Sequence, residues 1–242
     1  MSFDETPPKI VLSKDTIKRL IKDVRELMKS PLKSHGIYYE HSKEDILSGQ
    51  AMIIGPSETP YERGYYFFEF SFPTNYPYKP PTVTYHTNDG TTRFNPNLYK
   101  SGKVCLSILN TWEGEQWSGC QSISSVLLAL CTILNNKPLL NEPGITESNE
   151  DFYNYNKIIT FMNFKVGIVK LIKSPFIKNK FKELYTIMID DFVINFDKII
   201  DLVDRNKCSK TVVSTNIYKM SVFIDYSNLK EELYSLYNQF VI

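Results

Sequence analysis

One cysteine near the middle of the chain is surrounded by residue types that could make it a nucleophile. Cys105 follows the turn-forming stretch at 101–104, which predicts a thiol at the surface. Lys103 would favour the thiolate if it lies close, and Asn97, eight residues upstream, supplies a side-chain amide donor. The alternative is a buried structural cysteine, the common state of a free cysteine. The pattern predicts covalent chemistry through Cys105, with a core cysteine as the competing interpretation.

The other cysteines and the histidines offer no second site. Cys131 lies in the apolar run VLLALCTIL and is expected to be inert core, while Cys120 and Cys208 lack an amide or base at useful spacing. No CxxC pair or zinc-ligand spacing occurs, so we expect reduced thiols and no metal. The histidines all precede Cys105, outside any hydrolase-type signature, which argues against a Cys-His hydrolase.

The first half of the chain predicts a helix followed by strands. Ser13 can cap a helix that ends before Pro31 and presents one apolar stripe: Ile17, Leu20, Ile21, Val24, Leu27 and Met28. Its other face is basic. Four short aromatic or β-branched stretches between 36 and 87 predict an antiparallel meander, and we expect helices to cover only one face of that sheet. The stretch 87–121 then reads as a long ordered loop that carries Cys105.

The second half is mainly helical. Ser122 can cap an almost uniformly apolar helix, expected to be buried on most sides, and two helical stretches follow the break at 142–144. Beyond Ser174 and Pro175 the pattern predicts one long helix from FKELY to about residue 205, a stretch of short strands or irregular chain, and a terminal helix. The fold class predicted is α+β.

Composition narrows the setting in which this chemistry would occur. The 242 residues are 42% hydrophobic and 23% charged, with a formal net charge of +1, so no global field favours nucleic acid or an anionic membrane. The sequence contains no run of 18 apolar residues and no apolar stretch of signal-peptide length at its start. We expect an intracellular protein of the cytoplasm or nucleus, without membrane or nucleic-acid partners.

Several motifs in order resemble those of the ubiquitin-conjugating enzymes: MIIGPSETPYERG, FPTNYPYKPPTV, NPNLYKSGKVCLSIL, Trp117-Ser118 and NEPG. The resemblance implies a tail at 1–13, a conjugating core at 14–173 and a mainly helical C-terminal extension at 174–242. It also implies the family fold: an N-terminal helix, a four-stranded antiparallel meander, an active-site loop and three further core helices.

The resemblance implies that Cys105 accepts ubiquitin or a ubiquitin-like protein as a thioester from an activating enzyme and passes it to a lysine amine. ATP is used by the activating enzyme, so no cofactor is implied here. Asn97 matches the Asn of the family's His-Pro-Asn motif, where it donates to the oxyanion, braces the loop or only fixes a turn. Asn95 replaces the His of that motif. Tyr99 and Glu142 match groups that orient the incoming amine and lower its pKa.

Other departures point to a subfamily and to partners. An insertion at 110–116 separates Cys105 from Trp117 and brings an extra aromatic, Trp112, which could shield the thioester or pack on the loop. This insertion and the extension most resemble the C-terminally extended subfamily that can carry ubiquitin or FAT10, or the conjugating domain of the giant inhibitor-of-apoptosis protein. Tyr78 and Ser118 match positions that contact a ligase.

Three questions remain open at the level of sequence. The basic helix face resembles the surface that docks on the activating enzyme, but an ordinary solvated face would look the same. The extension could select partners or stabilise the core. A catalytically silent binding module with the same fold is the competing function, although such variants lack the cysteine that is present here.

Overall fold

The centre of the fold is a four-stranded antiparallel sheet, as predicted. The computed structural model describes residues 12–241, so the predicted tail at 1–13 lies almost wholly outside the described residues. The strands follow one another across the sheet: β1 (Ile37–His41), β2 (Ser48–Ile54), β3 (Tyr65–Ser71) and β4 (Thr82–Tyr85). Ala51 on β2 pairs with Phe68 on β3, which places both side chains on one face. Successive side chains of β3, from Tyr65 to Phe68, are buried, so the sheet has two apolar faces to cover.

Helix α1 (Lys14–Lys29) begins where predicted, and its buried face overlaps the predicted stripe only in part. Ser13 caps it by accepting from the Thr16 backbone N–H at 3.0 Å. Leu20 and Leu27 of the stripe are buried, whereas Ile21 and Met28 are exposed. The buried face also includes two polar residues: Thr16, which donates to the Thr74 carbonyl at 2.8 Å, and Asp23, which binds two side chains described below. Satisfied polar groups can be buried, so the buried face is turned toward residues that an apolar pattern does not count.

Helix α2 (Ile123–Ile133) has the predicted cap and less burial than predicted. Ser122 and Ser125 form a reciprocal capping box. The buried residues lie at three- and four-residue spacing, while Leu128 is 41% exposed. Cys131 is half-buried rather than core, and this partial burial raises the pKa of its thiol. The helix is therefore apolar all round but covered on one side only.

The predicted pair of helical stretches after residue 144 forms one continuous helical element. Helix α3 (Phe152–Phe164) runs into a π-helical turn (Lys165–Lys170) without a break. The long helix predicted beyond residue 180 is instead two helices, because the chain bends at Asn195, whose side-chain amide donates to the Asp191 carbonyl at 3.1 Å. The helices of the extension are α4 (Pro175–Lys180), α5 (Lys182–Ile194), α6 (Phe196–Arg205) and α7 (Tyr226–Tyr237).

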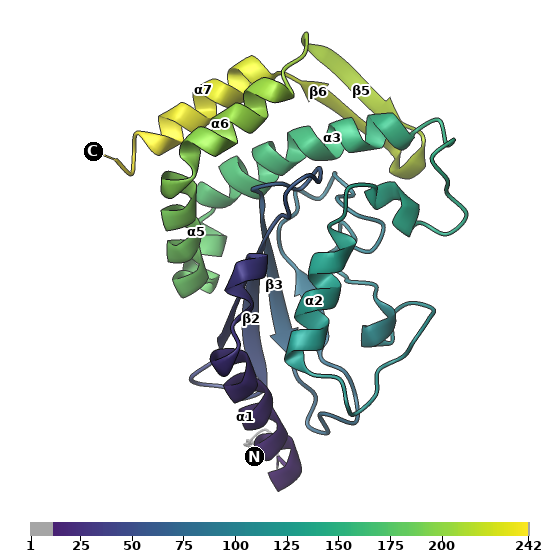
Figure 1. Cartoon of the computed structure of the whole chain (residues 1–242), viewed down its shortest axis with the longest axis vertical. Helices are drawn as coiled ribbons and strands as arrows, with labels where there is room; N and C mark the ends of the chain where they lie inside the picture. Colours follow the sequence, from purple (N-terminus) through teal and green to yellow (C-terminus); the bar gives the residue numbers. More distant parts are fainter. Residues whose placement is uncertain (1–11, 242) are drawn as a thin grey trace, which may run out of the picture.

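The short strands predicted in the extension form an antiparallel pair. Strands β5 (Thr211–Thr215) and β6 (Met220–Ile224) lie against α3, and a single turn (Ile217–Lys219) joins them. The remaining short turns are 3₁₀ helices at Leu32–His35, Ser107–Leu109 and Pro138–Asn141. In Figure 1 the extension, coloured green to yellow, lies across α3 at the end of the molecule away from the start of α1.

The extension also covers the second face of the sheet, which the sequence analysis expected to be partly open. The Phe67 ring lies 5.0 Å from the ring of Phe181, and the Tyr65 hydroxyl donates to Asp191 at 2.9 Å. Glu69 on the same face pairs with Lys180 at 2.8 Å. The expectation was wrong because it counted only the core helices, and residues 174–194 supply a second layer. Between residues 12 and 241 no helix is long and apolar enough to cross a membrane.

Candidate active site

The loop that carries Cys105 is folded back on itself, and this brings Asn97 to the cysteine. The Cys105 backbone N–H donates to the Asn97 carbonyl at 2.9 Å, and the Asn97 side-chain amide donates to the Cys105 carbonyl at 2.7 Å. A bridge between Leu98 and Val104 continues the pairing. The Asn97 side-chain oxygen is buried without a hydrogen-bond partner in the described part of the chain. Asn97 is therefore tied to the backbone of Cys105 through both its carbonyl and its side-chain amide.

Asn95 fixes the start of this loop. Its side-chain amide donates to the Tyr61 hydroxyl at 2.9 Å and to the Ile133 carbonyl at 2.7 Å. Its side-chain oxygen accepts from the Asn97 backbone N–H at 2.9 Å. Asn95 is fully buried, so these bonds satisfy groups that would otherwise be costly to bury. Asn95, which stands where the motif it resembles has a histidine, thus uses both its side-chain NH2 group as a donor and its side-chain oxygen as an acceptor.

Cys105 is 2% exposed, so the expectation of a thiol at the surface was wrong. The inserted segment is tied to the chain on either side of this cysteine. The Thr111 hydroxyl donates to the Val104 carbonyl at 3.0 Å and accepts from the Leu106 N–H at 2.9 Å. These bonds hold the insertion against both neighbours of Cys105. Trp112, within the same insertion, is half-buried.

Tyr99 and Glu142 each have a partner that the sequence analysis missed. The Arg93 guanidinium carbon lies 3.4 Å from the centre of the Tyr99 ring, and the Glu142 carboxylate accepts a hydrogen bond from the Tyr218 hydroxyl. Lys103, predicted to act on the thiol, is exposed and has its Nζ 5.7 Å from the Tyr99 ring centre. No local motif marks Arg93 or Tyr218, and Tyr218 comes from the extension.

Arg93, which precedes the Asn95–Asn97 segment, holds that segment through hydrogen bonds to its backbone. Its Nε donates to the Asn95 carbonyl at 3.1 Å, and its Nη2 donates to the Pro96 carbonyl at 2.7 Å. Its own carbonyl accepts from the Tyr155 hydroxyl on α3 at 2.7 Å. The position of the loop therefore depends on a cation that the sequence alone gave no reason to select.

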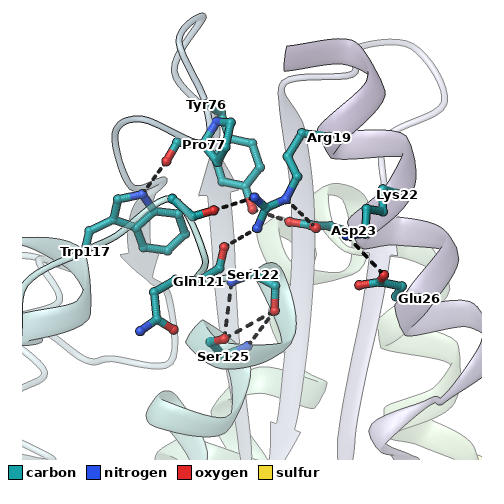
Figure 2. A network of polar contacts seen from close by, with 11 residues as sticks. Arg19, Lys22, Asp23, Glu26, Tyr76, Pro77, Trp117, Gln121, Ser122 and Ser125 are labelled. Carbon is teal, nitrogen blue, oxygen red and sulfur yellow. Dashed lines mark hydrogen bonds and ion pairs between the residues drawn. The ribbon is translucent and has the colours of Figure 1, made fainter. Parts of the chain in front are cut away.

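A second polar network connects α1 to the loop before α2 (Figure 2). The Arg19 Nε pairs with Asp23 at 2.8 Å, and the rest of its guanidinium donates to the carbonyls of Gly119 and Gln121. The Tyr76 hydroxyl donates to the same Asp23 carboxylate. Burial tends to lower the pKa of Arg19, but the hydrogen bond and charge of Asp23 outweigh it and raise the pKa. Arg19, which belongs to the basic face of the helix noted in the sequence, is thus bound to a loop.

The predicted ligase-contact residues lie beside this network. Tyr78 is 76% exposed, and Ser118 is exposed as well. Between them, the Trp117 indole N–H donates to the Pro77 carbonyl at 2.6 Å, and the ring lies 5.8 Å from that of Tyr76 (Figure 2). Both exposed side chains are therefore mounted on loops that Arg19 and Trp117 hold in place. Within residues 12–241, no group of three or more His, Cys, Asp or Glu side chains could hold a metal ion.

Comparison with known proteins decides the family. Residues 19–161, which include Cys105 and its paired loop, match the family model for the ubiquitin-conjugating enzyme. The chain belongs to this family. Among ubiquitin-conjugating enzymes, it is 39% identical over 158 residues to the human ubiquitin-conjugating enzyme E2 Z, covering 64% of this chain and 44% of that protein. It is 38% identical over 164 residues to the E2 Z of Xenopus tropicalis, covering 66% and 52%.

A viral relative matches a larger share of the chain. The probable ubiquitin-conjugating enzyme E2 R521 of Acanthamoeba polyphaga mimivirus is 34% identical over 189 residues, covering 72% of this chain and 13% of that protein. The chain spans about half the length of the E2 Z proteins that it matches. These comparisons confirm the fold class, the family and the predicted resemblance to its C-terminally extended subfamily.

Proposed function

We propose that Cys105 carries ubiquitin or a ubiquitin-like protein as a thioester and passes it to a lysine amine. The observation that carries this proposal is the paired loop: Asn97 and Cys105 exchange two hydrogen bonds, at 2.7 and 2.9 Å. This arrangement fixes the backbone of Cys105 against a buried amide in the part of the chain that matches the family. The family itself supports a thiol acyl carrier rather than a hydrolase.

In the loading step, the Cys105 thiolate would attack the carbonyl of the thioester on an activating enzyme. A new carbon–sulfur bond forms on Cys105, and the activating enzyme's cysteine leaves as the thiolate. Because Cys105 is 2% exposed, this step requires the chain around it to move, and the insertion tied to both neighbours of Cys105 by Thr111 is the proposed moving segment. The same insertion would then cover the loaded thioester and exclude water.

In the transfer step, a lysine amine would attack the thioester carbonyl, and Cys105 would leave as thiolate. The amine begins as an ammonium and loses one proton, for which the Glu142 carboxylate is the proposed acceptor. Asn97 braces the loop in the unloaded protein, since its amide donates to the Cys105 carbonyl at 2.7 Å. For Asn97 to donate to the oxyanion instead, its amide must turn away from that carbonyl during transfer.

The proposed partners follow from the family and from the exposed groups. They are a ubiquitin-like modifier, its activating enzyme, protein substrates and a ligase that contacts Tyr78 and Ser118. Tyr78 is 76% exposed on a loop whose position is fixed, which suits an aromatic anchor at a protein interface. The names of the relatives favour ubiquitin as the modifier, and the resemblance of the extension makes FAT10 the second modifier to examine.

The burial of Cys105 favours one alternative, a catalytically silent module that binds a modifier without carrying it. One experiment separates the two. The protein is incubated with ATP, ubiquitin or FAT10, and a panel of activating enzymes, and thiol-sensitive adducts are counted by mass. We expect an adduct that Cys105→Ala abolishes, while Cys120→Ala and Cys208→Ala, at exposed cysteines, retain it. Absence of any adduct with every pairing would contradict the proposal and leave the silent module.

A further inference from the structure

The turn between β5 and β6, residues 216–219, reaches from the extension to the active-site loop. The Asp151 carboxylate, at the start of α3, accepts from the backbone N–H groups of Asn216 at 3.0 Å and Ile217 at 2.7 Å. From the active-site loop, Lys100 Nζ donates to the Tyr218 carbonyl at 3.3 Å. The turn is thus tied both to the core helix and to the loop that carries Cys105.

The backbone of this turn is unusual for the residues that it contains. Tyr218 has φ 59° and Lys219 has φ 49°, both in the left-handed region that favours glycine. Consecutive non-glycine residues in this region are costly and persist only where surrounding contacts hold them. The contacts to Asp151 and Lys100 are of that kind. Their result is that the Tyr218 side chain lies against the core, with its ring 6.1 Å from that of Tyr155.

The Tyr218 hydroxyl donates a hydrogen bond to the Oε2 atom of Glu142. Burial raises the pKa of Tyr218, and the bond to Glu142 raises it further, so the phenol keeps its proton at neutral pH. Oε1, the second oxygen of Glu142, has no hydrogen-bond partner between residues 12 and 241. A carboxylate that is held through Oε2 can accept a hydrogen bond, and then a proton, from an incoming amine through Oε1.

The Tyr218 ring also faces the cation that holds the active-site loop. The Arg93 guanidinium carbon lies 5.1 Å from the centre of the Tyr218 ring and 3.4 Å from that of Tyr99. Arg93 donates to the carbonyls of Asn95 and Pro96, at the start of the loop. Its backbone N–H approaches the sulfur of Met220 at 3.3 Å, next to the same turn. Tyr218 therefore contacts both the proposed proton acceptor and the support of the Asn97 loop.

We propose that Tyr218 is a positioning residue of the active site, acting through two different groups. Its hydroxyl orients Glu142 toward the incoming lysine, and its ring steadies Arg93 and thereby the loop with Asn97. The extension would then be part of the transfer machinery as well as a cover for the sheet. The role of the hydroxyl rests on the proposed transfer to lysine, whereas the role of the ring can be measured without it.

Tyr218→Phe tests the hydroxyl, with Tyr153→Phe as the matched control at a tyrosine that is 74% exposed. Each protein is loaded once on Cys105, the activating step is stopped, and discharge is followed against the concentration of free lysine. We expect Tyr218→Phe to load normally and to need about tenfold more lysine for half-maximal discharge, because a bond to a charged group is lost. The control should match the wild type.

Two results of this experiment would overturn the role of the hydroxyl. An unchanged dependence on lysine concentration would show that Glu142 needs no help from Tyr218. An equal loss of loading and discharge would show that the substitution only damages the fold. If the wild type takes no modifier from any activating enzyme, the proposed function fails, and the role of the hydroxyl falls with it.

Amide hydrogen exchange on the unloaded protein tests the ring by itself. Tyr218→Ala should raise exchange across residues 93–99, whereas Tyr218→Phe, which keeps the ring, should leave that segment protected. Exchange in α1 should be unchanged in both and serves as the internal reference. Tyr218→Leu replaces the alanine variant if that variant does not fold. Equal protection of residues 93–99 in the wild type and in the variant without the ring would refute the contact's role.

Discussion

Arg19→Ala should destabilise the protein far more than removal of a cation from a helix surface usually does. The Asp23 side chain is 2% exposed and that of Arg19 is 18% exposed, with 2.8 Å between the paired atoms. The substitution leaves Asp23 charged and buried, with the Tyr76 hydroxyl as its remaining side-chain donor. It also removes the donors to the carbonyls of Gly119 and Gln121 (Figure 2).

The magnitude follows from these two losses. Removing one partner of a buried ion pair costs about 3–5 kcal/mol, and the lower end applies because Tyr76 still donates and Arg19 is not fully buried. The two carbonyl contacts add roughly 1 kcal/mol together, since water can replace part of them. We therefore expect the free energy of unfolding to fall by about 4 kcal/mol. For a chain of this size that corresponds to a fall in Tm of about 8–16 °C.

Urea unfolding monitored by circular dichroism measures this change, with Arg25→Ala as the matched control. Arg25 lies on the same helix, is exposed and should cost less than about 0.5 kcal/mol. The double variant Arg19→Ala with Asp23→Asn should recover roughly half of the loss, because the unpaired charge is gone. A loss for Arg19→Ala no larger than for Arg25→Ala would refute the buried pair as the support of the loop.

Two further predictions concern access to the thiol and acid stability. Thr111→Val removes the hydroxyl that ties the insertion to both neighbours of Cys105. Alkylation of Cys105 by iodoacetamide, measured in peptide maps relative to exposed Cys120, should therefore rise about fivefold. An unchanged ratio would show that the insertion does not control access to the thiol. Burial lowers the pKa of His41 and of His86, so the unfolded chain binds more protons than the folded one. The free energy of unfolding should therefore fall as the pH drops from 7.5 to 5.5. Replacing both histidines by Gln should flatten this pH dependence, and an equal slope in the variant and the wild type would contradict the prediction.

Local patterns predicted the elements of the fold because those elements depend on near neighbours. Ser13 and Ser122 cap their helices as expected, and the four strands pair in sequence order. The errors arise where distant residues decide. Asp23 is buried because Arg19 and Tyr76 satisfy it, and a count of apolar positions cannot register that pairing. Whether the second face of the sheet is covered likewise depends on where residues 174–194 pack, and no local hydrophobic periodicity encodes that position.

In the candidate site, too, contacts between near neighbours were predicted and contacts between distant segments were missed. Asn97 and Cys105, which the sequence singled out together, belong to one folded loop and lie side by side in the structure. The partners of Tyr99 and Glu142 were missed, because Arg93 reaches across from outside the motif and Tyr218 comes from the extension. The exposure of Cys105 was misjudged because the turn before it predicts only a change of chain direction, whereas burial depends on the segments that pack around the thiol. Sequence spacing predicts contacts within a loop well and contacts between separate segments poorly.

The most direct test of the central claim is to replace the thiol by a hydroxyl and to locate the modifier. Cys105→Ser is incubated with ATP, modifier and the activating enzyme that charges the wild type, and the product is digested and mapped by mass spectrometry. The account predicts a modifier linked to position 105 through an ester that resists thiols and is cleaved by hydroxide. A modifier found on Cys120, Cys131 or Cys208 of the wild type, with none at position 105, would contradict it.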